Sequence, residues 1–199
     1  GFTAVNTNIK GVWLGDAAFG DYNRDGYPDL AIIGATSAGS PYSPVLIVYQ
    51  NNGGNFSAAS TMPGLFGSSL DWGDYNKDGK PDLLVTGKNS SGETVAQIYQ
   101  NGGGGRFAKQ PRAQLKGVWM GDGVWGDYDK DGNLDILLTG QSAGGTPASL
   151  VFRSLGDWNF AYQPKIKLPG MDYSSASFKD YNLDGYPDIL LAGKLQGNT

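Results

Sequence analysis

A nine-residue acidic segment occurs four times in this chain, and each copy begins 53 residues after the previous one. The segment has the pattern Asp-Tyr-(Asn/Asp)-x-Asp-Gly-x-(Pro/Leu)-Asp and begins at Asp21, Asp74, Asp127 and Asp180. Two glycine columns keep the same step, at Gly11, Gly64, Gly117 and Gly170 and at Gly34, Gly87, Gly140 and Gly193. A fixed period of this length indicates a repeat architecture, in which one supersecondary unit is used several times.

Each repeat has the pattern of short strands separated by turns. A glycine-rich stretch ends in an aromatic residue before the acidic segment, and a short apolar run such as Leu30–Ile33 follows it. A third run, such as Val45–Tyr49, leads through a turn to a segment that opens with Phe56 or its counterpart. Four short strands in about 50 residues are typical of a propeller blade, whereas helical repeats would show a 3.6-residue periodicity. We therefore expect an all-β fold, a β-propeller of four-stranded antiparallel blades.

The repeats divide the chain into the parts of one propeller domain or propeller segment. Repeat 1 covers residues 11–63, repeat 2 residues 64–116, repeat 3 residues 117–169, and a partial repeat 4 residues 170–199. Residues 1–10 match the outermost strand of a blade, because Phe2 lies in the column of Phe56. Since the fourth repeat is incomplete, we expect a longer parent chain or a homo-oligomer to complete the propeller.

Composition excludes several classes of function. The chain contains no cysteine and no histidine, which removes disulfides, thiolate metal sites and a Ser-His-Asp triad. Its net charge of −4 argues against nucleic-acid binding, which needs clustered Lys and Arg. The apolar runs are too short for a membrane-spanning helix, so membrane insertion is not expected, and the first residues lack the pattern of a signal sequence.

The acidic segments carry oxygen ligands in a fixed register. Side-chain oxygens fall at positions 1, 3, 5 and 9, a glycine permits a sharp turn at position 6, and the variable position 7 offers its backbone carbonyl. The predicted metal ligands are Asp21, Asn23, Asp25, Tyr27 and Asp29; Asp74, Asn76, Asp78, Lys80 and Asp82; Asp127, Asp129, Asp131, Asn133 and Asp135; and Asp180, Asn182, Asp184, Tyr186 and Asp188.

Ca²⁺ is the cation that this register favours, because it takes roughly six to eight oxygen ligands from short, flexible loops. Zn²⁺ would use Cys or His, and Mg²⁺ demands stricter octahedral geometry. The segments are not EF-hands, since an apolar residue replaces the bidentate Glu at position 12 in all four copies. We expect about four Ca²⁺ per chain, one in each acidic segment, with a mainly structural role at the joint between two strands.

The first repeat resembles the FG-GAP repeat. Phe19-Gly20, the acidic segment and Gly34-Ala35 match that family's motif, with Thr36 where the family has Pro. The resemblance implies the propeller fold of the integrin alpha-subunit head, with Ca²⁺ bound between the first and second strands of a blade. Such propellers usually have more blades than the four repeats of this chain.

The middle repeats look like the related VCBS-type repeat of bacterial surface and secreted proteins. This likeness lies in residues 72–82 and 125–135. Through the 53-residue repeats that carry these motifs, the resemblance spans nearly the whole chain. Departures from the motif are small. Leu134 replaces a Pro, and Lys179 replaces the Gly that precedes the acidic segment in the other repeats.

Five side chains outside the acidic segments are candidates for ligand binding. They are Trp13, Asp16, Trp119, Asp122 and Trp158. The two aspartates fall on strands that would line the propeller channel, where ordinary polar lining is the alternative interpretation. The first two tryptophans could stack on sugars or fill gaps between blades, as the aromatic column of Phe19 and its counterparts is expected to do. Trp158 has no counterpart in other repeats, and we expect it to be exposed in a turn.

The sequence favours a calcium-stabilised extracellular or cell-surface module for recognition or adhesion, with a protein or carbohydrate ligand. Extracellular Ca²⁺ would fill weak, open loops that would stay empty in the cytosol. One alternative is the propeller domain of a glycan-active lyase or hydrolase, although few groups remain for proton transfer and no catalytic residue is predicted. The other is a structural subunit of a surface assembly or filament, which would explain an incomplete blade.

Overall fold

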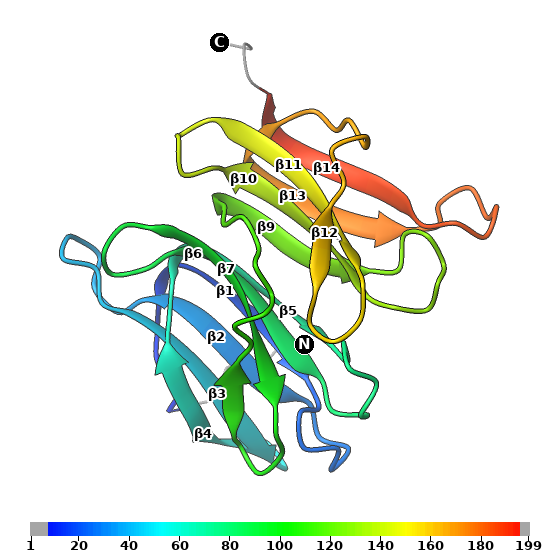
Figure 1. Ribbon diagram of the computed structural model, residues 1–199. Helices are drawn as coiled ribbons and strands as arrows, with labels where there is room; N and C mark the ends of the chain where they lie inside the picture. The colour runs from blue at the N-terminus through cyan, green and yellow to red at the C-terminus, as the bar shows by residue number, and fades with distance from the viewer. Residues whose placement is uncertain (1–7, 196–199) are drawn as a thin grey trace, which may run out of the picture.

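The computed structural model describes residues 8–195, which form antiparallel β-sheets joined by turns (Figure 1). This range contains no helix, and therefore none that is long and apolar enough to cross a membrane. The all-β expectation is confirmed. Of the predicted outer strand at residues 1–10, residues 1–7 lie outside the described range, and residues 8–10 are not part of a strand.

Repeats 1 and 2 each form a four-stranded sheet in chain order, which we call blades 1 and 2. Blade 1 consists of β1 (Trp13–Gly20), β2 (Asp29–Ala35), β3 (Pro44–Asn52) and β4 (Asn55–Pro63). Blade 2 consists of β5 (Phe66–Gly73), β6 (Asp82–Lys88), β7 (Thr94–Asn101) and β8 (Phe107–Lys109). These two sheets have the antiparallel four-stranded order that the repeat pattern predicts.

Repeats 3 and 4 share one larger sheet. Blade 3 consists of β9 (Trp119–Gly126), β10 (Asp135–Gln141), β11 (Pro147–Ser154) and β12 (Phe160–Tyr162), and blade 4 of β13 (Met171–Lys179) and β14 (Asp188–Leu195). A single residue pair, Ala148 with Met171, joins β11 to β13 and makes the strand order β14-β13-β11-β10-β9. The described part of blade 4 is therefore a two-stranded unit attached to blade 3.

The blades follow one another in chain order, from blue β1 to red β14 in Figure 1. The first strands of successive blades are in contact, β1 with β5, β5 with β9 and β9 with β13. Each of these inner strands carries a bulge at the same place, marked by a positive φ angle at Leu14, Gly67, Met120 and Tyr173. The period of the sequence is thus a period of the backbone.

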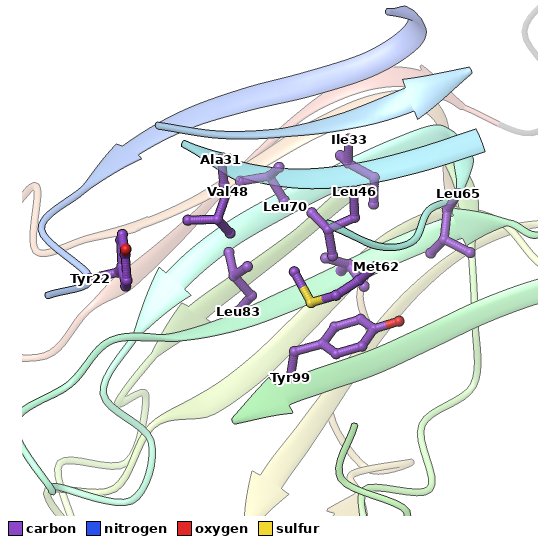
Figure 2. Packing of buried hydrophobic residues seen from close by; sticks show 11 residues of the cluster. Tyr22, Ala31, Ile33, Leu46, Val48, Met62, Leu65, Leu70, Leu83 and Tyr99 are labelled. Carbon is purple, nitrogen blue, oxygen red and sulfur yellow. The ribbon is translucent and has the colours of Figure 1, made fainter. Parts of the chain in front are cut away.

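The core lies between neighbouring blades. Ile33, Leu46 and Val48 of blade 1 face Leu83 and Leu70 of blade 2, and the cluster excludes water almost completely (Figure 2). The second strand of blades 1 and 2 is apolar on both faces because both are covered. At about 25 cal/mol per Å² of apolar surface, this burial is the main source of stability for a fold with no helix and no disulfide in the described range.

A glycine at the end of each of the first three inner strands receives an aromatic ring from the next blade. Trp72 lies against Gly20, Trp125 against Gly73, and Phe178 against Gly126. The expectation of an inter-blade core therefore holds for these three aromatic residues. It is wrong for Phe19, which is 67% exposed because no earlier blade precedes β1 in the described range.

Substitution of Gly73 by Ala is expected to destabilise the fold by about 1–3 kcal/mol, the usual effect of overpacking. A Cβ at this position would lie 2.6 Å from Cδ1 of Trp125 and 2.9 Å from Cδ1 of Leu134. Gly39→Ala is the matched control, since a Cβ there meets nothing within 4 Å. Urea unfolding measures both variants, and equal stability of the two would contradict the close packing of Trp125 on Gly73.

Candidate metal centres

Each acidic segment forms the loop between the first and second strands of its blade. We name these loops 1 to 4: residues 21–29 join β1 to β2, 74–82 join β5 to β6, 127–135 join β9 to β10, and 180–188 join β13 to β14. The position predicted for the loops, at the joint of two strands, is the one observed.

The backbone of the loops is held by their own carboxylates. In loop 1, the amide of Gly26 donates to Oδ2 of Asp21 at 3.0 Å, and the amide of Tyr27 donates to Oδ1 of Asp25 at 2.9 Å. The same two bonds recur in the other three loops. Position 4 has a positive φ angle in every loop, at Arg24, Lys77, Lys130 and Leu183. The sequence pattern identified the turn glycine at position 6 but gave no sign of this second turn residue.

The aspartate at position 9 ties its loop to the third strand of the blade. Asp29 is fully buried, its Oδ2 accepts the amide of Tyr22 at 3.1 Å, and its Oδ1 accepts the amide of Asn51 at 2.8 Å. In blade 3, the two oxygens of Asp135 accept the corresponding amides at 3.1 and 2.8 Å. In loops 1 and 3 this carboxylate therefore fastens the start of the loop to the second and third strands.

The loops leave buried carboxylate oxygens without partners. Oδ2 of Asp82 and Oδ1 of Asp127 are buried and accept no hydrogen bond. In loop 3, one oxygen from each of Asp127, Asp129 and Asp135 lies within 4.8 Å of the others. Burial also raises the pKa of Asp82 and of Asp135 to about 6, which means that their ionised forms are poorly stabilised by the protein alone. An oxygen-only set of this kind fits a hard divalent cation, and Ca²⁺ satisfies that requirement.

Asp16 and Asp122 bridge the inner strands of neighbouring blades. Oδ2 of Asp16 accepts the amide of Leu70 at 3.1 Å. Oδ1 of Asp122 accepts the hydroxyl of Ser69 at 2.6 Å, and its Oδ2 accepts the hydroxyl of Ser175 at 3.2 Å. These contacts account for the two residues structurally, and a role in ligand binding stays a prediction.

The three candidate tryptophans differ in their surroundings. Trp13 is 60% exposed, whereas the Nζ of Lys88 lies 3.4 Å from the ring centroid of Trp119. The expectation that Trp158 is exposed is wrong. Its ring is half-buried, 4.8 Å from that of Tyr75, and packs against the core cluster of blades 2 and 3. Positive φ angles at Asp157 and Trp158 accompany this placement, and a turn pattern alone does not reveal them.

Asp71 is a buried carboxyl group that the repeat pattern does not single out. It lies on β5, and its Oδ2 accepts the amide of Trp125 at 2.9 Å. Burial raises its pKa to about 6, and the nearby charges of Asp122 and Asp16 add to this effect. The column that Asp71 occupies holds Ala18 and Val124 in the flanking repeats, so periodicity gave no signal.

We expect Asp71→Asn to stabilise the protein by about 2 kcal/mol at pH 8 and to have little effect at pH 4. Because the folded pKa of Asp71 is above its unfolded value, protonation favours the folded state, and that contribution is lost as the pH rises through about 6. Asparagine keeps the acceptor for Trp125 without the charge. Urea unfolding of both proteins from pH 4 to 8 measures the difference in their free energies of unfolding. A difference that does not change with pH would contradict the raised pKa.

These loops and repeated sheets define a blade-type β-repeat protein with Asp-rich loops. Three segments match the family of FG-GAP-like repeats, at residues 21–85, 74–138 and 127–191. Each match begins at one acidic loop and ends in the strand after the next, so that together they include all four loops. Because the matches cover more than half of its residues, the chain belongs to the FG-GAP-like repeat family, as its motifs predicted.

Integrin alpha subunits are among the curated relatives. The chain is 34% identical to integrin alpha-7 of Homo sapiens over 134 residues, which are 60% of this chain and 11% of the relative. It is 27% identical to integrin alpha-3 of Cricetulus griseus over 171 residues, 74% of this chain and 16% of the relative. The chain therefore spans only 11–16% of the length of these two relatives.

Proposed function

We propose that this chain is a calcium-stabilised module for recognition or adhesion outside the cell. The observation that carries the proposal is the repeated oxygen-only loop with unpartnered buried carboxylate oxygens, in a chain similar to integrin alpha subunits. These relatives favour a protein ligand over a carbohydrate. The blades form a rigid support, and binding residues are commonly found on the loops of such a support.

In this proposal each of the four loops binds one Ca²⁺. The carboxylates or amides at positions 1, 3, 5 and 9 and the carbonyl at position 7 would hold the ion, with the residues named from the sequence. A bound cation would offset the burial of the position-9 carboxylates, which are fully buried in loops 1 to 3. Its role is then to keep the loop and the second and third strands of a blade together.

We also propose that further blades cover both ends of the described row and form a propeller. Phe19 is 67% exposed at one end, and Leu190 is 68% exposed at the other. Their counterparts between blades are packed, and Leu84 and Leu137 are fully buried. A longer parent chain or a second copy would supply these blades. The contact that blade 4 would make with a further blade differs from the three contacts between the described blades. Lys179 ends the first strand of blade 4, whereas a glycine ends the first strand of blades 1 to 3.

A binding survey tests the proposed recognition function. Labelled protein is applied to a panel of purified extracellular-matrix proteins and to a glycan array, in about 1 mM Ca²⁺ and in excess EGTA. The proposal predicts binding to a protein probe that is lost in EGTA, with no chemical change in the probes. Absence of binding by the folded, Ca²⁺-loaded protein would overturn the recognition function, and cleavage of an arrayed glycan would replace it with a glycan-active enzyme.

A further inference from the structure

Loop 3 differs from the other loops at position 3. Loops 1, 2 and 4 have an asparagine there, and loop 3 has Asp129, which gives it four side-chain carboxylates instead of three. An additional negative charge in so small a site would strengthen repulsion within the loop before any cation is bound. The structure shows a compensating residue outside the loop.

The asparagine of the other loops has a defined task. Its Nδ2 donates to Oδ2 of the aspartate at position 5, from Asn23 to Asp25 at 2.8 Å and from Asn182 to Asp184 at 3.0 Å. Loop 2 has the same bond, at 3.2 Å, and Lys80 also contacts the accepting oxygen. Oδ1 of the same aspartate accepts the amide of position 7 in every loop. The side-chain amide of the asparagine, together with the backbone amide of position 7, thus fixes the orientation of the position-5 carboxylate.

Arg153 of β11 provides this bond in loop 3. Its Nη2 donates to Oδ2 of Asp131 at 3.0 Å, the same oxygen that receives the asparagine amide elsewhere. Its Nε forms an ion pair with Oδ2 of Asp129 at 2.5 Å. The pairing of the strands places Gln50 and Gln100 at the position of Arg153 in blades 1 and 2, so the arginine accompanies the aspartate in one repeat only.

We propose that Arg153 is the positioning residue of the third loop, where it replaces the asparagine amide and fixes the orientation of the Asp129 and Asp131 carboxylates in the proposed Ca²⁺ site. The guanidinium combines a hydrogen bond to Asp131 with an ion pair to Asp129, and its planar, delocalised charge suits two adjacent carboxylates. When only the carboxylates and this guanidinium are counted, loop 3 carries a charge of −3, the same as the three carboxylates of each other loop. This role rests on the proposed calcium sites, and it makes the third site depend on Arg153 of β11.

The test follows the amide signal of Gly132 by NMR during Ca²⁺ titration of four proteins: wild type, R153Q, D129N and D129N/R153Q. This amide reports on loop 3 because it donates to Oδ2 of Asp127 at 2.9 Å. R153Q is expected to weaken Ca²⁺ binding in loop 3 about 10- to 100-fold, as loss of outer-shell support does elsewhere. The double variant has asparagine at position 3 and glutamine on the third strand, as blades 1 and 2 do. Its affinity for Ca²⁺ at loop 3 should lie within about threefold of wild type, because the two residues act as a pair.

The amide of Gly26, which donates to Asp21 in loop 1, is the internal control for folding and for Ca²⁺ binding. If no glycine signal of the wild type responds to Ca²⁺, the proposed calcium sites fail. If Gly26 responds normally but R153Q binds Ca²⁺ at loop 3 as tightly as wild type, the positioning role fails. Tighter binding by R153Q would also overturn it, since it would make Arg153 a competitor of the cation.

Discussion

Removal of Ca²⁺ is expected to lower the melting temperature of this protein by about 20 °C or more. An ion at a hundred times its Kd stabilises the folded state by about 2.7 kcal/mol, and about 1 kcal/mol changes the melting temperature of a domain of this size by 2–4 °C. The four proposed sites would contribute in parallel. The physical source is the position-9 carboxylate, which is fully buried in three of the loops and in each of them accepts a backbone amide of the third strand. Without the cation, its burial is uncompensated.

Circular dichroism melts in about 1 mM Ca²⁺ and in excess EGTA measure this effect. Mg²⁺ at the same concentration is the matched control, because it keeps more of its waters and fits these loops less well. Asp135→Asn should remove roughly the contribution of one ion, since it keeps the shape of the side chain and loses its charge. Identical melting temperatures in Ca²⁺ and EGTA would contradict the structural role of the metal.

Leu137→Ala is expected to destabilise the protein by about 3–4 kcal/mol, the range for removing a large aliphatic side chain from a core. Leu137 is fully buried and forms a cluster with Val151 and Ala176, against which Phe178 packs. These residues come from blades 3 and 4. The substitution therefore removes contacts that hold two blades together.

Leu190→Ala is the control for this prediction, because Leu190 occupies the same column of the repeat but is 68% exposed. It should change the free energy of unfolding by less than about 0.5 kcal/mol. Urea unfolding monitored by tryptophan fluorescence compares the two variants. A similar decrease in the free energy of unfolding of both variants would contradict the difference in packing between Leu137, inside the row of blades, and Leu190, at its end.

The sequence predicted most of what is periodic in this protein. The 53-residue step located the loops, their joints with two strands and the inter-blade aromatic residues Trp72, Trp125 and Phe178. Each of these features repeats because each blade packs on the next in the same way. Hydrophobic pattern and turn chemistry are sufficient to show such features when several copies are compared.

What the sequence did not reveal depends on contacts that only one blade makes. Trp158 was expected to be exposed, and a turn with two positive φ angles accompanies its packing against Tyr75. Phe19 belongs to the aromatic column but lacks a preceding blade in the described range. The pairing of Arg153 with loop 3 joins a strand residue to residues of a loop, 22 positions apart for the bond to Asp131, and no local pattern connects them.

Calorimetric titration of the demetallated protein with Ca²⁺ measures how many calcium ions the loops bind. Four loops with the same register and the same internal hydrogen bonds predict about four Ca²⁺ per chain, and EGTA should reverse the binding. A protein in which all four position-9 residues, Asp29, Asp82, Asp135 and Asp188, are changed to Asn should show no such uptake. A flat titration of the folded wild-type protein would contradict the account.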